Sequence, residues 1–176
     1  MKECRLKIPL FPALILMALL TLMAASCARR AETIRIEDSN ARVVKAVTHA
    51  TAVGLGDILK SAGDETRRIE IIRAFIDPIR FFEDESGYFF VYTSKNFCIA
   101  HAMDKTLLDK DLSGLQDMKG TFIGNELYKM AQKGGGYVTF YWPHPQTKNE
   151  QRKIGYAELI PDTDYYIGTG YYPDTK

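Results

Sequence analysis

The sequence predicts an α+β domain with a long N-terminal helix packed on one face of a five-stranded antiparallel sheet. A helical cover is expected over a small-ligand pocket on the other face. Three observations predict this class. Apolar residues recur at helical spacing between residues 38 and 77. From residue 88 onwards, five aromatic and β-branched runs have the composition of strands. A polar segment with one further helical pattern, residues 104–134, separates the second run from the third.

Composition limits the classes of protein to which the chain can belong. Its 176 residues include 23 basic and 22 acidic side chains, and the formal net charge of +1 gives no sign of a nucleic-acid partner. An apolar fraction of 46% excludes disorder for most of the chain. The three cysteines are too few and too scattered for a disulfide framework or a zinc site. We therefore expect one compact domain.

Residues 1–26 have the layout of a signal peptide. Three basic residues precede an uncharged, mostly apolar run that ends in small residues at positions 24–26. Cys27 then stands where a bacterial lipobox has its acylated cysteine, so we expect a lipoprotein anchored in the membrane through Cys27. Two alternatives stay open. Ordinary cleavage would give a soluble secreted protein, and an uncleaved anchor is possible because a helix needs about 20 apolar residues to cross a bilayer. All three place the domain outside the cytoplasm, on the periplasmic face.

Two helices are predicted at the start of the domain, after a charged tether at residues 28–37. The first helix begins at Asp38. The second is capped by Asp64 and ends at Asp77, before a proline. A short helical turn at residues 79–82 is expected to follow. The apolar stripe of the first helix is formed by Val44, Val47, Thr51, Leu55 and Ile58.

Strands dominate the second half of the domain. Residues 94–96 form a polar break between the first two strands, which is typical of a β-hairpin. A helix at residues 121–132 precedes the third strand, and the glycines at 134–136 end it. The predicted strands are Tyr88–Thr93, Phe97–Met103, Tyr137–Trp142, Lys153–Ile160 and Tyr165–Tyr172.

Four segments carry a resemblance to a known family: GYFFVY at 87–92, IAHAM at 99–103, GTFIGNELYKMAQKGGGYVTFYWPHP at 120–145 and IGTGYY at 167–172. In this order and spacing they resemble the single Cache domain, a PAS-like extracytoplasmic sensor module of bacteria, which would occupy residues 38–176. The resemblance implies one pocket for a small metabolite, often an organic acid. Members usually belong to chemoreceptors, histidine kinases or cyclase-type proteins. Because this sequence carries neither a second membrane span nor an output domain, we expect signal transduction through a separate receptor or kinase in the membrane.

Aromatic side chains are the first candidates for the pocket. Alternate residues of a strand share a face, so Tyr88, Phe90 and Tyr92 lie together, on a face that meets either the long helix or the pocket. Tyr92 is expected either to offer a pocket hydroxyl or simply to pack in the core. Tyr141 and Trp142 fall on opposite faces of their strand. One of the two is expected to line the pocket, the alternative being that both belong to the core.

Polar candidates follow from the ligand class. A buried carboxylate needs a cation, and Arg80, Lys119 and Lys153 are the candidates, each of which could instead be a solvated surface charge. Arg80 would hold a carboxylate through two parallel hydrogen bonds, and Lys153 begins a strand beside Tyr156. His101 is either a ligand contact or a structural hydrogen-bonding group. The expected ligand-binding residues are Arg80, Tyr92, His101, Tyr141, Trp142, Lys153 and Tyr156.

Motifs for metals, cofactors and catalysis are absent from the sequence. His49 and His144 belong to no cluster with metal-ligand spacing, and the acidic stretch 109–117 lacks the spacing of a calcium loop, so we expect a solvated loop there. No nucleophile elbow or haem motif is present, and Cys98 has no sequence-level partner that would lower its pKa. We therefore expect neither an enzyme nor a bound cofactor.

The sequence thus predicts a sensor module that binds a small organic acid. The alternative is a ligand-free structural or protein-interaction lipoprotein with the same fold. A pocket filled by its own aromatic side chains, with no cation pointing inward, would favour that alternative. Domains of the resembled family dimerise through the first helix, so a weak parallel homodimer is a further expectation.

Overall fold

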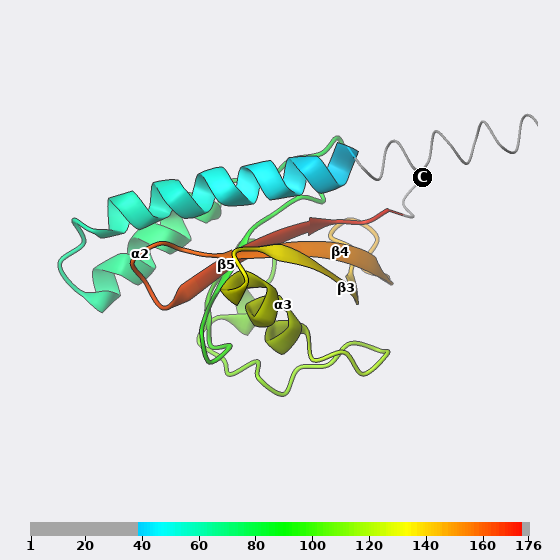
Figure 1. The fold of residues 1–176 in the computed structure, drawn as a ribbon. Coiled ribbons are helices and arrows are strands. Elements are labelled where there is room, and N and C mark those ends of the chain that lie inside the picture. The colour runs from blue at the N-terminus through cyan, green and yellow to red at the C-terminus, as the bar shows by residue number, and fades with distance from the viewer. Residues whose placement is uncertain (1–38, 174–176) are drawn as a thin grey trace, which may run out of the picture. The chain divides into compact units, whose positions relative to one another are not determined.

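The computed structural model describes residues 39–173, whose helices and strands are shown in Figure 1. The predicted signal peptide, the acylated Cys27 and the tether lie outside the described residues. Among residues 39–173, no helix is both long enough and apolar enough to cross a membrane.

The five strands form one sheet in the order β2-β1-β5-β4-β3, and each strand is antiparallel to its neighbours. The last strand, β5, therefore occupies the centre, between the β1–β2 and β3–β4 hairpins, and is buried along its whole length. The predicted sheet and fold class are confirmed. The strands are β1 (Phe90–Thr93), β2 (Cys98–His101), β3 (Gly136–Pro143), β4 (Glu150–Leu159) and β5 (Tyr165–Tyr171).

The N-terminal helix, described over residues 39–59, packs on the sheet through a stripe that differs in part from the predicted one. Val44 and Leu55 are buried as expected, but Ile58 is 42% exposed, and the fully buried Ala52 and Leu59 lie on the inner face instead. Thr48 is also buried there, because its hydroxyl donates to the Val44 carbonyl at 2.6 Å and so needs no water.

The second helix, α2 (Glu65–Ile76), begins and ends as predicted. The Asp64 side chain accepts a hydrogen bond from the Arg67 amide at the N-cap. The helical turn expected at residues 79–82 is absent. Phe81 instead exchanges two backbone hydrogen bonds with Gly87, and a Cβ at Gly87 would lie 2.4 Å from the Phe81 ring. The two hydrogen bonds form an isolated antiparallel bridge where the turn was expected.

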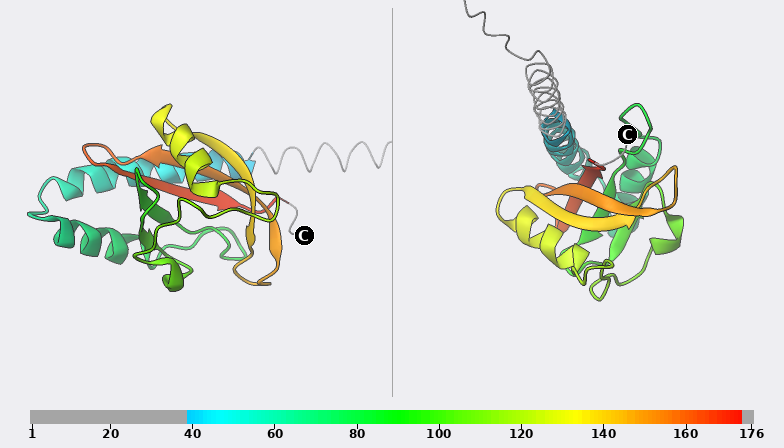
Figure 2. Two further views of the ribbon diagram at one scale, coloured as in Figure 1. Left: turned by 90° about the horizontal axis from the view of Figure 1, so that it is seen from below. Right: turned by 90° about the vertical axis from the view of Figure 1, so that its right-hand side faces the viewer.

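The helices lie on both faces of the sheet. Figure 1 shows the N-terminal helix on one side and α3 (Ile123–Gln132) on the other, and Figure 2 shows the same arrangement from two further directions. Phe89 and Val91 of the first hairpin pack with the N-terminal helix and α2, whereas Phe90 and Tyr92 pack under α3. The sequence did not decide whether Phe90 and Tyr92 face the long helix or the pocket. In the structure they point towards the cover.

Candidate functional site

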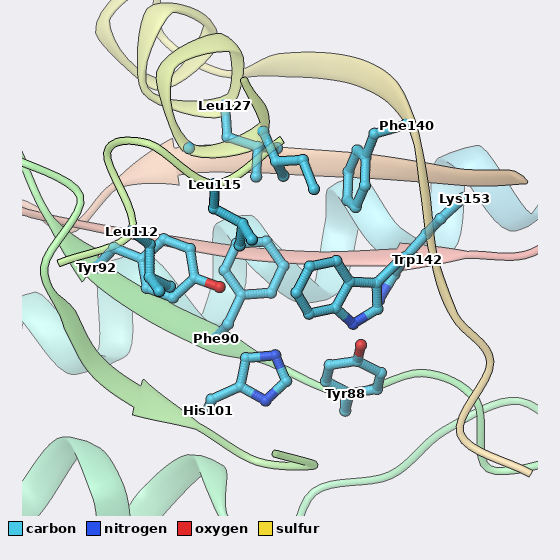
Figure 3. A pocket seen from close by; sticks show the side chains of 12 residues that line it. Tyr88, Phe90, Tyr92, His101, Leu112, Leu115, Leu127, Phe140, Trp142 and Lys153 are labelled. Carbon is cyan, nitrogen blue, oxygen red and sulfur yellow. The ribbon is translucent and has the colours of Figure 1, made fainter. Parts of the chain in front are cut away.

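A small cavity lies between the sheet and the cover, which consists of α3 and the loop before it (Figure 3). The centre of a water molecule could move within a volume of about 10 Å³ in it, so the cavity has room for about one water molecule. Its walls come from strands β1 to β4, from α3 and from the cover loop. The lining residues are Tyr88, Phe90, Tyr92, His101, Leu112, Leu115, Ile123, Gly124, Leu127, Phe140, Trp142 and Lys153.

The floor of the cavity depends on one glycine of the central strand. Phe90 pairs with Gly168 of β5, and a Cβ on Gly168 would lie 2.4 Å from the Phe90 ring. The ring of Phe90 therefore rests on the β5 backbone, and it stacks with Tyr92 at 5.1 Å between centroids. Only a glycine at this position of IGTGYY leaves room for the Phe90 ring.

Lys153 is the cation of the cavity. It is 1% exposed, and its ammonium lies 3.9 Å from the centre of the Tyr88 ring and 5.1 Å from that of Tyr172. Among residues 39–173 no carboxylate forms an ion pair with it. Burial lowers the pKa of Lys153 from 10.5 to about 7, because the charge has left water without a counter-ion. The aromatic faces stabilise the ammonium only in part.

A chain of hydrogen bonds runs along the wall beside Lys153. The Tyr88 hydroxyl is hydrogen-bonded to both Trp142 and Tyr172, and Tyr172 donates to the Pro143 carbonyl at 2.9 Å. Indole nitrogen can only donate, and the single hydroxyl proton of Tyr172 is already used. The chain therefore runs from Trp142 through Tyr88 and Tyr172 to Pro143. Figure 3 shows the Tyr88 oxygen, the indole nitrogen and the Lys153 nitrogen close together.

His101 forms part of the wall opposite the cover. Its Nδ1 accepts a hydrogen bond from the Asp104 amide at 2.8 Å, so in the neutral ring Nε2 carries the proton. Burial and then the nearby charge of Lys153 lower the pKa of His101 to about 3, and the ring stays neutral at physiological pH. The structural role expected for this histidine is present, and its remaining N–H is still a donor at the cavity.

The polar groups of the cavity are thus mostly donors. The Lys153 ammonium, the His101 Nε2 and the hydroxyl of Tyr92 line the space together with the Tyr88 hydroxyl and the Trp142 indole, which are bonded to each other, and no acidic side chain is among the lining residues. Such a site favours a small anion with an apolar part over a cation, because a cation would meet Lys153 with no counter-charge.

Four of the seven predicted site residues meet at the cavity: Tyr92, His101, Trp142 and Lys153. Alternation along the strands explains why two others do not. Tyr141 follows Phe140 on β3 and faces outward, beneath the ammonium of Lys119, which is 5.7 Å from its ring. Tyr156 lies on the helix side of β4, where it packs with Val44.

Arg80 is held away from the cavity by the backbone. Its guanidinium donates to the carbonyl oxygens of Asp77, Ile79 and Ala102 at 2.6 to 3.0 Å. The guanidinium donors that were expected to hold a carboxylate ligand are thus bonded to backbone carbonyls. Arg80 therefore fixes the chain between α2 and the first hairpin.

Sequence reasoning missed the contribution of the cover loop. Leu112 and Leu115 line the cavity, although the segment is mostly polar. Asp117 was expected in a solvated loop, but its carboxylate accepts hydrogen bonds from the amides of Lys119, Thr121 and Tyr141 at 2.8 to 2.9 Å. Burial raises the pKa of Asp117, but these bonds together outweigh it, so that the pKa is lowered, and they tie the cover to the edge strand β3. The alternation that grouped Tyr88 with Phe90 could have identified Tyr88.

Comparison with known proteins places this geometry in context. A family model described as a Cache domain matches residues 36–175. The methyl-accepting chemotaxis protein McpP of Pseudomonas putida is 29% identical over 123 residues, which are 66% of this chain and 22% of that protein. The chain thus spans about a fifth of the length of this curated relative.

Two solved structures share the fold over most of their length. One is a methyl-accepting chemotaxis protein from Vibrio parahaemolyticus, with a TM-score of 0.70 and 26% identity over 81% of this chain and 95% of that one. The other is a Cache chemosensory domain, determined as a structural basis for carboxylic acid recognition. Its TM-score is 0.68, with 25% identity over 80% of this chain and 97% of that one.

Proposed function

Because the chain belongs to the Cache domain family of sensor domains, we propose that it binds a small carboxylate in the cavity under α3 and acts as the sensing part of a signalling system. One observation carries the ligand class: a buried ammonium, that of Lys153, stands among hydrogen-bond donors with no acidic side chain at the cavity. The similarity to a chemosensory domain that recognises carboxylic acids supports the same class.

The geometry indicates how the ligand would lie. Its carboxylate would lie against the Lys153 ammonium, at the end of the cavity where Figure 3 also shows the Tyr88 hydroxyl and the Trp142 indole. Its hydrocarbon part would contact Phe90 and Leu127, which are apolar and nearly inaccessible. The charge–charge contact would replace the missing counter-ion of Lys153 and raise its pKa. Binding therefore relieves an electrostatic cost that the ligand-free protein carries.

A filled pocket and the lack of an inward cation were expected for a ligand-free protein, and the cavity has the first feature but not the second. The cavity is nearly filled by its own side chains, which favours a structural protein. The inward cation favours a ligand, because an apolar side chain of similar size would fill the same space without the cost of a buried charge. The buried cation therefore supports the ligand-binding function over the structural one.

Fluorescence of the full chain provides the test. Trp142 is the only tryptophan of the sequence and lies at the cavity, so its emission reports ligand entry. Acetate and propionate are titrated against acetamide, a neutral analogue of nearly the same shape. We expect saturable changes with the acids and none with the amide. Equal responses to acetate and acetamide, or flat curves with all three, would favour the ligand-free alternative.

We further propose that the domain lies outside the cytoplasm, is anchored by acylated Cys27 and acts on a separate membrane receptor or kinase. Metabolic labelling with palmitate tests the anchor, and Cys27→Ser is the control, since it removes the candidate cysteine and leaves the buried Cys98 unchanged. We expect label in the membrane fraction of the parent and none in the variant. Equal labelling of both would rule out Cys27 as the acylated residue.

A weak homodimer through the N-terminal helix also remains a proposal. Val43, Ala46, Ala50 and Val53 are exposed and recur three and four residues apart along this helix, which is the spacing of a coiled-coil seam. Sedimentation of the parent chain and of Val53→Glu tests it. We expect concentration-dependent association of the parent alone, and a monomeric parent at high concentration would overturn the proposal.

A further inference from the structure

A second concavity lies at the end of the domain where the N-terminal helix turns into α2. The loop between β4 and β5 comes to the same end, as Figures 1 and 2 both show. The cleft between them has a volume of about 250 Å³, which is much larger than the cavity under α3. Its lining residues are Gly56, Leu59, Lys60, Arg68, Asp162 and Thr163.

The walls of the cleft are held at a fixed separation. A Cβ at Gly56 would lie 3.0 Å from Pro161, so the helix and the β4–β5 loop touch through backbone and ring. Lys60 bridges the same two elements, with its ammonium 3.5 Å from the carboxylates of both Asp57 and Asp162. The hydroxyl of Thr163 donates to a carbonyl of its own loop at 2.8 Å and is not free.

Arg68 is the unexplained residue of this cleft. Its Nε is buried, and within residues 39–173 it has no hydrogen-bond partner. No carboxylate of the described residues pairs with its guanidinium either. Glu65, three residues before Arg68 on the same helix, is engaged by the Tyr165 hydroxyl. The adjacent Arg67 differs, because it forms an ion pair with Glu70 at 3.0 Å.

We propose that this cleft is a binding site for a small oxyanion, with the guanidinium of Arg68 as its principal donor and the ammonium of Lys60 beside it. Lys60 is already paired with Asp57 and Asp162, so among the described residues the guanidinium of Arg68 is the positive charge of this lining that no carboxylate pairs, and a singly charged anion would balance it. A guanidinium can hold a carboxylate or a phosphate through two parallel hydrogen bonds, and the bond from Nε would satisfy the buried donor. The site is independent of the cavity under α3 and of the ligand proposed there.

The test observes the donor itself. In the ¹⁵N-labelled full chain, the Nε–H groups of arginines give their own correlation signals, and Arg68→Gln assigns one of them by its loss. The protein is titrated with sodium phosphate and, separately, with sodium acetate, each against sodium chloride at equal ionic strength. We expect the Arg68 signal to shift and saturate with at least one of the two anions. The stronger response identifies the oxyanion class, phosphate or carboxylate.

Matched variants separate a built site from general attraction of anions to a charged surface. Arg68→Gln should weaken binding, followed through backbone signals of residues 56–60, by about tenfold or more, since charge-assisted hydrogen bonds are lost. Arg67→Gln removes the same charge one residue away and should change it by less than about twofold. If Arg68→Gln does not fold, Lys60→Gln replaces it, with weakening again expected. Absence of saturation with both anions, or equal effects of Arg67→Gln and Arg68→Gln, would overturn the proposal.

Discussion

Replacing Lys153 by methionine tests the carboxylate site at its centre, because methionine fills a similar volume without the charge. A lysine pKa held at about 7 instead of 10.5 corresponds to about 5 kcal/mol against the folded state, at about 1.36 kcal/mol per pH unit. The contacts of the ammonium with Tyr88 and Tyr172 offset part of this cost. We therefore expect the ligand-free Lys153→Met protein to unfold at a higher temperature at pH 7. We also expect it to bind acetate about 10 to 100 times more weakly.

The pH dependence of the parent protein has a defined sign. The pKa of Lys153 is lower in the folded chain than in the unfolded one, so the unfolded chain binds more protons between about pH 7 and pH 10.5. Ligand-free stability should rise with pH across this window, and the destabilisation is fully present below it. Acetate needs the ammonium, so its affinity should fall about tenfold from pH 6 to pH 8. His101 and Tyr88, which face Lys153, stay neutral over this range.

Thermal unfolding and Trp142 fluorescence, measured at pH 6, 7 and 8, give both quantities. Lys119→Met is the matched control, because Lys119 is exposed and lies beside Tyr141 on the outer face of the sheet. This variant should keep the affinity of the parent and its pH dependence. Two results would refute the reasoning: a Lys153→Met protein that binds acetate as tightly as the parent, or a parent whose affinity does not change between pH 6 and pH 8.

Three further predictions concern the scaffold of the site. Leu55→Ala removes a fully buried side chain of the helix-side core and should cost about 2 to 5 kcal/mol in the free energy of unfolding by urea, with no change in acetate affinity per folded molecule. Gly168→Ala places a methyl group 2.4 Å from the ring of Phe90 and should lower the melting temperature and alter Trp142 fluorescence; an unchanged protein would mean that Phe90 moves freely. Asp117→Asn puts a donor against the Tyr141 amide, so hydrogen exchange of the cover loop should accelerate, and protection equal to the parent would contradict its role.

The sequence was a good guide to the fold because the fold depends on local pattern. Aromatic and β-branched runs identified all five strands, and a capping aspartate with a following proline gave both ends of α2. The inner face of the first helix was less certain, since Ile58 and Leu59 are adjacent and equally apolar. Which of them is buried depends on where α2 and the β4–β5 loop pack. The spacing of apolar residues within the helix does not predict that contact.

The candidate site was harder to predict because it requires the direction of each side chain. Alternation along a strand separates Lys153 from Tyr156 and Trp142 from Tyr141, but sequence alone does not say which set faces the cover. Arg80 looked suitable for a carboxylate from its chemistry alone. Its actual partners are backbone carbonyls that only the tertiary fold brings within reach.

The small size of the cavity limits how tightly a ligand can bind in it. Acetate has four heavy atoms, and a ceiling of about −1.5 kcal/mol per atom limits its binding free energy to about −6 kcal/mol, or a Kd of some tens of micromolar. Acetate is larger than the one water molecule for which the cavity has room, so side chains of the cover must move for it to enter. The free energy of that movement is subtracted from the affinity. Leu112 and Leu115 of the cover loop line the cavity, so under the proposed function we expect them to move when a ligand enters. Under the proposed function, occupancy of the buried cavity would thereby change the surface of the cover, and a low affinity would suit a ligand present at high concentration.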